Sequence, residues 1–258
     1  MSRILSYGIS HRGLVRLNNE DVWDALHEKN AYFLADGMGG HSAGEVAAQE
    51  SINELKRSFE ALTKDPSSPQ EALLFLKEAF FAANEWVYTL SRQEEAWRGM
   101  GTTSCCAWIL NETLLYAHVG DSRIYRFSND RLDQLTQDHS LRQEFILKGY
   151  TPLPSRNIIT RSIGTTAYVE PDLGKCAIKP GELYLLCSDG LSDCVSSEEI
   201  AVILRRKRTL EETSLELLEA AINKGGNDNI TLIMLSCLDE ATDLSRQQCN
   251  DAAGQPGL

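Results

Sequence analysis

Residues 32–48 read "YFLADGMGGHSAGEVAA", and this stretch decides how the rest of the chain is interpreted. An apolar run typical of a buried strand ends directly in Asp36-Gly37. Three further glycines then lead into a segment whose composition favours a helix. The stretch therefore predicts a strand, a glycine-rich connection and a helix, with a carboxylate at the strand end.

Two nucleotide-binding loops share this strand–glycine–helix pattern, and both are excluded. Gly39 and Gly44 have the G-x-x-x-x-G spacing of a phosphate-binding loop. The next residues, Glu45 and Val46, replace the Lys and Ser/Thr of that loop, and a glutamate would repel the phosphates. A dinucleotide fingerprint fails because its third glycine would fall on Ser42.

Other acids stand beside strongly apolar segments in the same way. "YLLCSDG" is a near copy of "YFLADG". Taken singly, each Asp-Gly is explained by a turn, because both residues tolerate the required backbone angles. Taken together, the acids that flank apolar strands form a set: Glu20, Asp21, Asp36, Asp121, Asp189 and Asp228.

If these strand ends converge, the carboxylates would repel one another and lose hydration, so their pKa values would rise. Such a cluster is stable in its ionised form only when cations compensate it. Oxygen ligands without His or Cys select Mg²⁺ or Mn²⁺ over Zn²⁺. Two ions bridged by carboxylates suit phosphoryl hydrolysis, and they would let a chain of net charge −12 bind a phosphate dianion.

The composition narrows the remaining classes. The chain has 258 residues, of which 42% are hydrophobic, and no Lys/Arg-rich block, which argues against nucleic-acid binding. Its apolar runs are too short to span a membrane, and residues 1–13 lack the apolar region of a signal peptide. Seven cysteines without a C-x-x-C pair argue against a disulfide framework or a zinc site. We expect a cytoplasmic protein with no membrane association.

Two helices are predicted between the first strands and residue 91. Ser42 with Glu45 and Ser68 with Glu71 have the spacing of capping boxes, and Pro69 stands at the first position of the second helix. The apolar stripes expected to face the core are Ile52, Leu55, Phe59 and Leu62 in the first helix, and Leu73, Leu76, Phe80, Ala83, Val87 and Leu90 in the second.

From residue 101 the pattern predicts short strands joined as an antiparallel meander: "TTSCCAWIL", "TLLYAHVG", "SRIYRFS" and "RLDQLT". A helix is expected at "HSLRQEFILKG", and strands at "NIITRSI", at about 168–178 and at "GELYLLCSDG". A helix pair over 196–223, with Ile200, Ile203 and Leu204 buried, precedes the buried strand "NITLIMLSCL". Alternating groups of strands and helices predict an α+β fold of stacked sheets with helices outside.

The ordered set of motifs resembles the metal-dependent Ser/Thr protein phosphatase family of the type 2C class, in its bacterial single-domain form. The matching motifs are "RLNNEDVW", "FLADGMGGHSAGEVAA", "GTTSCCAWI", "AHVGDSRIY", "LTQDHS", "NIITRSIG", "LYLLCSDGLSD" and "GGNDNITLIML". The resemblance implies a central β-sandwich of two antiparallel sheets flanked by helix pairs. It implies one phosphatase domain over residues 1–238, followed by a flexible C-terminal tail over residues 239–258.

The resemblance also implies a set of site residues. It makes Asp36 the carboxylate that bridges two Mn²⁺ or Mg²⁺ ions, with the Gly37 carbonyl beside it. The other implied metal ligands are Asp189 and Asp228, with Asp21 and Glu20 acting through water or from behind, and Asp121 and Asp193 for a weaker third ion. Arg16 stands where the family places its phosphate-binding arginine, and a bidentate, permanently charged guanidinium suits that task.

Two departures from the family bear on the chemistry. Met38 occupies the position where some relatives have a histidine proposed to protonate the leaving group, and that role is not transferred to His41. The segment "LKGYTPLPSRNIITR" is shorter than the flap of bacterial relatives, so the family's use of the flap in substrate selection is not transferred to it. His118 is expected to pack within a strand. His139 is expected to cap or hydrogen-bond near a helix start.

The function implied is hydrolysis of phosphoserine and phosphothreonine in proteins by a metal-activated hydroxide, which reverses the action of a cognate Ser/Thr kinase. Two alternatives remain at this point. One is an inactive pseudo-phosphatase that binds phosphoproteins, although Asp36, Asp189 and Asp228 are all present. The other is the same chemistry on phosphorylated metabolites or partner-switching proteins. We expect a monomer.

Overall fold

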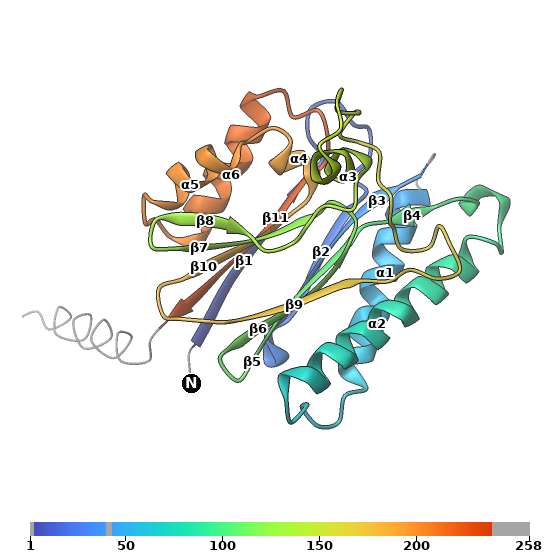
Figure 1. The fold of residues 1–258 in the computed structure, drawn as a ribbon, viewed down its shortest axis with the longest axis horizontal. Coiled ribbons are helices and arrows are strands. Elements are labelled where there is room, and N and C mark those ends of the chain that lie inside the picture. Colours follow the sequence, from blue (N-terminus) through green and yellow to red (C-terminus); the bar gives the residue numbers. More distant parts are fainter. Residues whose placement is uncertain (1–2, 40–42, 239–258) are drawn as a thin grey trace, which may run out of the picture.

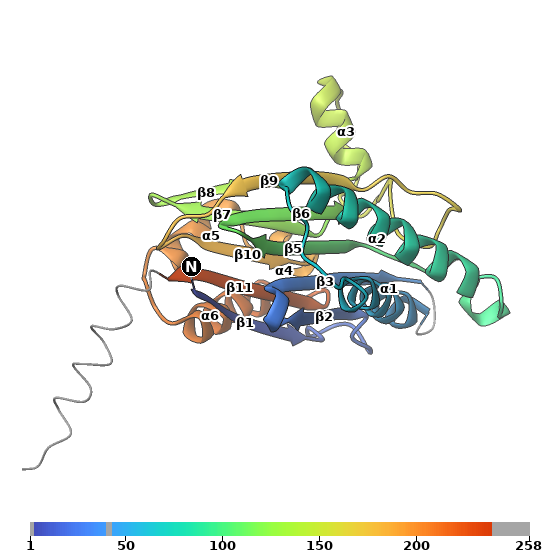
Figure 2. The same cartoon turned by 90° about the horizontal axis from the view of Figure 1, so that it is seen from below.

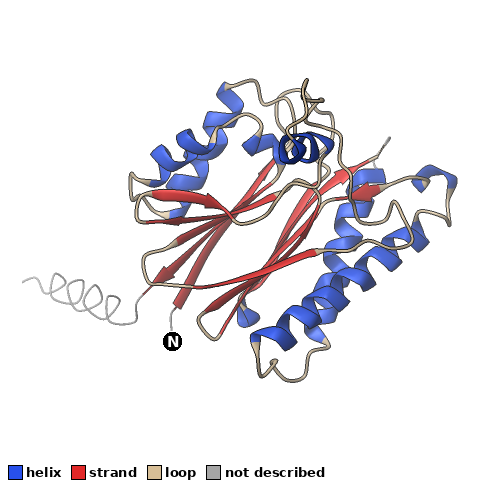
Figure 3. Ribbon diagram, viewed as in Figure 1, coloured by secondary structure: helices blue, strands red, loops and turns tan. Residues whose placement is uncertain are grey.

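Across residues 3–39 and 43–238, which the computed structural model describes, the strands form two antiparallel sheets packed face to face. Figures 1 and 3 show the two sheets in the centre with helices on both outer sides. The predicted α+β sandwich is therefore confirmed. Within these residues, no helix combines the length and apolarity needed to cross a bilayer.

The first sheet has the strand order β1-β11-β10-β7-β8, so the two ends of the fold lie side by side in it. Tyr7 of β1 pairs with Met234 of β11, and Leu185 of β10 pairs with the same residue from the other side. The strands are β1 (Arg3–His11), β11 (Ile230–Leu238), β10 (Leu183–Cys187), β7 (Arg123–Ser128) and β8 (Arg131–Gln134).

The second sheet has the order β2-β3-β5-β6-β9, with a short strand β4 paired to the end of β3. Asp21 at the start of β2 lies opposite Asp36 on β3. The strands are β2 (Asp21–Leu26), β3 (Ala31–Met38), β4 (Gly101–Thr102), β5 (Ser104–Leu110), β6 (Thr113–Val119) and β9 (Asp172–Ala177).

Helices cover both outer faces of the sandwich (Figure 1). On the second sheet they are α1 (Ala43–Glu60) and α2 (Pro69–Leu90); on the first they are α4 (Asp189–Ser192), α5 (Ser197–Leu204) and α6 (Leu210–Asn223). The remaining helix, α3 (Leu141–Lys148), projects from the body of the molecule (Figure 2). Short 3₁₀ turns lie at His27–Lys29 and Glu95–Trp97.

Three apolar layers hold the fold together. Successive side chains of a strand point to opposite faces of its sheet, so one strand contributes both to the layer under the helices and to the layer between the sheets. Phe33 of β3 points to the helices, where Phe59 of α1 lies edge-to-face against it and against Trp108, with ring centroids 5.3 and 5.0 Å apart. Leu34, the next residue, packs between the sheets with Ile233. A third layer lies under α5 and α6, where the predicted residues Ile200, Ile203 and Leu204 are buried.

The buried stripes are confirmed, except that Leu62 follows the end of α1. The cap at Ser68 is also confirmed, but the predicted return bond of Glu71 that would complete the capping box is wrong. Ser68 caps α2 by accepting the Glu71 N–H at 3.2 Å. The Glu71 carboxylate instead accepts the N–H and hydroxyl of Ser67, at 2.8 and 2.7 Å, because Ser67 offers two donors within reach. The other predicted capping box depends on Ser42, which lies outside the described residues.

Two strand predictions also need correction. The meander is interrupted after β6, because Gly120–Ser122 carries the chain from the second sheet to the first, so β5–β6 and β7–β8 are separate hairpins. Residues 157–163 form no strand. Only isolated bridges occur there, from Ser140 to Ile159 and from Thr102 to Ile163, because this stretch has no continuous partner strand.

Candidate metal centre

Four of the predicted carboxylates gather at one end of the sandwich, and each sheet contributes two. Asp21 and Asp36 pair across β2 and β3 in the second sheet. Asp189 opens α4 directly after β10, and Asp228 stands two residues before β11, the strand next to β10. In Figure 1 this is the end of the sandwich near α4. The prediction that distant acids converge here is confirmed.

Asp36 is held by the backbone and by two threonines. Its N–H donates to Thr103 Oγ1 at 3.0 Å, while its carbonyl accepts from Thr102 Oγ1 and from the Thr103 N–H, both at 2.8 Å. Gly37 continues β3 to Met38, so Asp36-Gly37 lies inside a strand. The turn explanation is therefore wrong for this pair.

Asp21 and Ser188 connect the two sheets behind the site. The Ser188 hydroxyl donates to Asp21 Oδ2 at 2.7 Å and accepts the Thr231 N–H at 3.0 Å. Asp21 is only 6% exposed and Ser188 is fully buried. Sequence reasoning missed Ser188, although it directly precedes the motif acid Asp189. Its role depends on a residue 167 positions away.

Asn229 positions the loop that carries Arg16 and Glu20. Its side-chain oxygen accepts the Glu20 N–H at 2.8 Å, and its amide group donates to the carbonyls of Arg12 and Asn18, both at 2.9 Å. Its position next to Asp228 in the motif "GGNDNITLIML" marked it as part of the site region. Nothing in the sequence showed that it holds the first loop.

Two glycines are required by close approach of the backbone. A Cβ on Gly37 would lie 2.2 Å from the Gly44 carbonyl oxygen, so β3 and the start of α1 pack with no room for a side chain. A Cβ on Gly190 would lie 1.9 Å from the Asn229 carbonyl oxygen. The glycine after each central aspartate therefore brings a neighbouring segment against the acid.

The electrostatics of the cluster are those of crowded, buried acids. Burial, followed by the charges of Asp189 and Asp228, raises the pKa of Asp21 to about 7. Burial, followed by Asp228 and Asp193, raises the pKa of Asp189 to about 6. The pKa of Asp36 is raised well above its usual value, first by burial and then by Asp21 and Asp189.

The carboxylate oxygens that lack partners indicate what the cluster would bind. Oδ1 of Asp21, of Asp121 and of Asp189 is buried without a hydrogen-bond partner. Buried polar atoms are normally satisfied, and anionic oxygens are satisfied best by a cation. Several carboxylates without imidazole or thiolate form an oxygen donor set that fits Mg²⁺ or Mn²⁺.

A cavity of about 450 Å³ opens over these acids. It brings together most of the predicted site residues: Arg16, Glu20, Asp36, Gly37, Asp121, Asp189 and Asp228, with Met38, Gly39, Asn157, Ile158, Ile159 and Asn229 completing the wall. Arg16 Nη2 lies 2.6 Å from Asp228 Oδ2, and half of the arginine side chain is exposed to solvent.

Two predicted site residues do not line this cavity: Asp21, which is buried behind it, and Asp193. The second of these, Asp193, has a different environment. It faces a neighbouring cavity of about 420 Å³, which Asp121 and Asp189 also line. There it pairs with Arg156, whose Nη1 lies 3.1 Å from Asp193 Oδ1. Burial, followed by Asp189 and Asp138, raises the pKa of Asp121 to about 7. Asp121 and Asp189 thus line both cavities, and an arginine from the segment after α3 contacts Asp193.

The family model and the curated relatives that match this chain agree with one another. A family model described as protein phosphatase 2C matches residues 8–224. A protein phosphatase named PhpP from Streptococcus pneumoniae is 35% identical over 237 residues, which cover 88% of this chain and 95% of that protein.

Solved structures agree. The chain superposes on the serine/threonine phosphatase PstP/Ppp of Mycobacterium tuberculosis with a TM-score of 0.84 and 36% identity, covering 93% of this chain and all of that one. It superposes with a TM-score of 0.83 and 35% identity on a catalytic domain of PstP described in complex with two manganese ions, over 93% of this chain and 100% of that one.

Proposed function

Because the chain belongs to the protein phosphatase 2C family, we propose that the acidic cavity is the active site of a metal-dependent serine/threonine protein phosphatase. Two divalent ions would be held by Asp36, the Gly37 carbonyl, Asp189 and Asp228. Asp21 and Glu20 would support them from behind and from the rim. The observation that carries this assignment is that buried carboxylate oxygens of Asp21, Asp121 and Asp189 lack hydrogen-bond partners, at the end of the sandwich where the two sheets meet.

The candidate ligand atoms are all oxygens, which is the donor type that Mg²⁺ and Mn²⁺ prefer. Relatives named serine/threonine phosphatases, one of them described with two manganese ions, support Mn²⁺. Mg²⁺ is an equally hard ion and a second candidate. We propose Asp121 and Asp193 as the holders of a third, weaker ion, because both contribute to the cavity next to Asp189.

When bound, the ions would supply Lewis-acid activation of a water molecule and of the phosphate. The chain's own residues would orient the substrate. Arg16 is half exposed at the cavity wall, so its guanidinium can exchange Asp228 for two phosphate oxygens. Met38 has no acidic proton, so the proton for the leaving alkoxide would come either from a bound water or from the Asp121 side of the cavity.

The substrates are phosphoserine and phosphothreonine side chains of proteins, and the reaction would oppose a Ser/Thr kinase. The expectations of a cognate kinase, a monomeric state and a cytoplasmic location stay predictions, as do the single domain over residues 1–238 and the tail over residues 239–258. Free thiols at all six cysteines in the described part of the chain agree with a reducing compartment. The tail lies outside the described residues.

The test is phosphate release from phosphothreonine and phosphotyrosine peptides with Mn²⁺ and with excess chelator. We expect hydrolysis of the phosphothreonine peptide that requires the metal and disappears in Asp189→Asn. The exposed Asp65→Asn variant serves as the control. A wild-type protein that binds the phosphopeptide without turnover would favour the pseudo-phosphatase alternative. Full activity of Asp189→Asn would contradict the metal-ligand assignment.

A further inference from the structure

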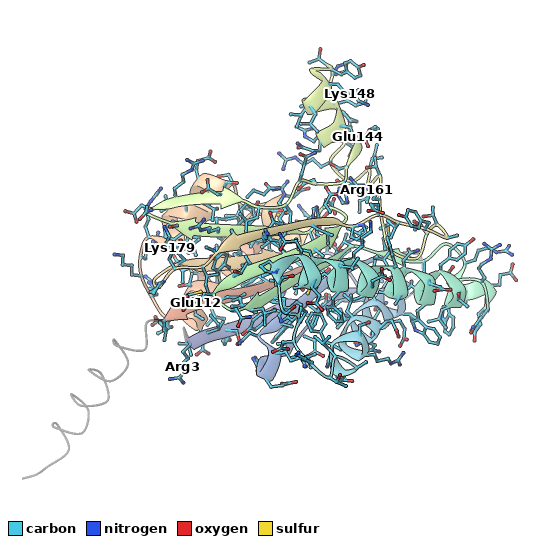
Figure 4. All side chains as sticks on the ribbon, turned by 60° about the horizontal axis from the view of Figure 1, so that its bottom comes forward. Arg3, Glu112, Glu144, Lys148, Arg161 and Lys179 are labelled. Atoms are coloured by element: carbon cyan, nitrogen blue, oxygen red, sulfur yellow. The ribbon has the colours of Figure 1, made fainter. Side chains whose placement is uncertain are left out.

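Two buried histidines form a cluster beside the acidic site. His118 on β6 and His139, two residues before α3, stack with ring centroids 4.5 Å apart and are 1% and 3% exposed. Asp172 on β9 pairs with His118 in the sheet and extends its Oδ2 to within 3.2 Å of His139 Nε2. Arg161 Nη1 donates to the other oxygen of Asp172 at 2.7 Å. Figure 4 shows Arg161 at the base of the projecting helix that carries Glu144 and Lys148.

These three side chains have the spacing of a metal site, since one ligand atom of each lies within 4.8 Å of the others. The hydrogen bonds argue against a metal. The Gly120 N–H donates to His139 Nδ1 at 3.1 Å, so in the neutral ring the proton is on Nε2, the atom that faces Asp172. A metal on Nε2 would require either removal of this only ring N–H proton or loss of the Gly120 hydrogen bond. The hydrogen bond from Gly120 therefore favours a structural role for the His139 ring.

His139 holds Gly120 from both sides. Its backbone N–H donates to the Gly120 carbonyl at 2.9 Å, while its ring accepts the Gly120 N–H. Gly120 has φ of +105° and directly precedes Asp121, at the point where the chain crosses from one sheet to the other. Fixing both peptide groups of Gly120 fixes the direction from which Asp121 enters the site.

The same histidine also holds the segment after α3. Its carbonyl accepts the Thr160 N–H at 2.8 Å, so residues 149–160, which carry Arg156 and part of the cavity wall, are anchored at their end. Burial, followed by the neighbouring His118, lowers the pKa of His139 to about 4. The ring therefore stays neutral near pH 7 and keeps Nδ1 available as an acceptor.

We propose that His139 is a positioning residue of the phosphatase site, which acts by orienting Asp121 through the Gly120 peptide groups. This inference rests on the proposed function of Asp121 as a ligand of the third ion. It assigns a task to a side chain that contacts neither substrate nor the acidic cavity. His118 and the Asp172–Arg161 pair keep the ring in the orientation that faces Gly120.

The test compares two substitutions. His139→Asn keeps an acceptor near the position of Nδ1, whereas His139→Leu has similar volume and no acceptor. Loss of an orienting partner behind a metal ligand typically costs about 10–100-fold in metal affinity or activity. We expect His139→Leu to lower kcat and weaken the third Mn²⁺ by about 10-fold or more, with KM within about 2-fold, and His139→Asn to recover most of both losses.

A readout without metal accompanies these measurements. Hydrogen exchange of the Gly120 amide in excess chelator should be faster in His139→Leu than in His139→Asn, because only Asn can accept its N–H. Phe59→Leu, in the aromatic cluster under α1, is a destabilising control that should lower Tm with kcat unchanged. Should His139→Leu fail to fold, the same comparison is made between His139→Asn and the wild type. A loss of third-ion affinity in His139→Asn while Gly120 amide protection is kept would then refute the inference.

A double-mutant cycle with Asp121→Ala separates positioning from a general effect on the fold. If His139 acts through Asp121, adding His139→Leu to Asp121→Ala should cost no further activity. The inference would be overturned if the losses of activity from the two substitutions multiplied in the double variant. It would also be overturned if Asp121→Ala had no effect on activity, or if His139→Leu kept the wild-type kcat. One Zn²⁺ bound tightly by the wild type and lost in His118→Asn would overturn it as well. Failure of the proposed function would appear separately, as wild-type protein without metal-dependent hydrolysis or as an active Asp189→Asn.

Discussion

Replacing Asp189 by asparagine should stabilise the metal-free protein while abolishing its activity. In the absence of metal the Asp189 carboxylate is buried beside Asp228 and Asp193, and its pKa is raised from 3.8 to about 6. A raised folded-state pKa means that folding favours the protonated acid. The penalty is therefore absent below about pH 3.8 and complete above about pH 6, where it amounts to about 3 kcal/mol.

Asparagine removes the charge and keeps the shape of the side chain. Its amide group can also donate a hydrogen bond to a neighbouring carboxylate oxygen of the cluster. Since the neighbouring acids share the repulsion, the expected gain is about 1–3 kcal/mol at pH 8. For a domain of this size that corresponds to a rise in Tm of about 2–12 °C. At pH 4.5 the gain should be less than half as large. Excess Mn²⁺ should reverse the order, because only the wild type gains binding free energy.

The assay is thermal unfolding in excess chelator at pH 4.5, 6 and 8, repeated with Mn²⁺ at pH 8. Asp65→Asn, at an exposed position, controls for the change in net charge and should shift Tm by less than 1–2 °C, roughly the effect of a surface substitution. The reasoning is refuted if Asp189→Asn has the wild-type Tm in chelator at pH 8. A gain that does not depend on pH would also refute it.

Four other substitutions test separate parts of the site. Arg16→Ala should raise KM about 10-fold with little change in kcat, measured on a phosphothreonine peptide; an unchanged KM would leave Arg16 a surface residue. Arg156→Ala releases Asp193 and should tighten the weakest Mn²⁺ up to about 5-fold by calorimetry, since exposed ion pairs are worth about 0.2–1 kcal/mol; equal binding would show that the pair does not compete. Asn229→Ala loses three hydrogen bonds and should lower the free energy of unfolding by about 2–3 kcal/mol, measured by denaturant unfolding; a wild-type denaturation midpoint would contradict this. Gly190→Ala should cost more than about 2 kcal/mol in the same assay, because its Cβ would overlap the Asn229 carbonyl oxygen; a loss below about 1 kcal/mol would contradict this close approach.

The layers of the fold could be predicted because their causes are local. Strands such as "YFLADG" show their burial in composition, and α2 shows its buried face in a stripe from Leu76 to Val87. The crossing at Gly120 could not be predicted in this way. Alternation along β6 and β7 shows which faces are buried, but it does not say whether both strands belong to the same sheet.

The residues of the site also fall into a predictable group and an unpredictable one. Its acids could be predicted, because a carboxylate at the end of a buried strand is costly and needs a reason to be there. The residues that hold the acids could not. Ser188, Asn229 and His139 are ordinary polar residues, and their partners lie 19 to more than 200 positions away in the chain. Their importance exists only once the hydrogen bonds are formed.

The division of acids between the sheets has a consequence for stability. Asp21 and Asp36 belong to one sheet, and Asp189 and Asp228 follow or precede strands of the other, so their repulsion acts across the interface that the central apolar layer closes. The Ser188–Asp21 hydrogen bond opposes only a small part of it. Cations held between the two pairs would replace this repulsion by a cross-link between the sheets. Chelation should therefore accelerate amide exchange at the ends of β3 and β10 more than at the opposite end of the same strands.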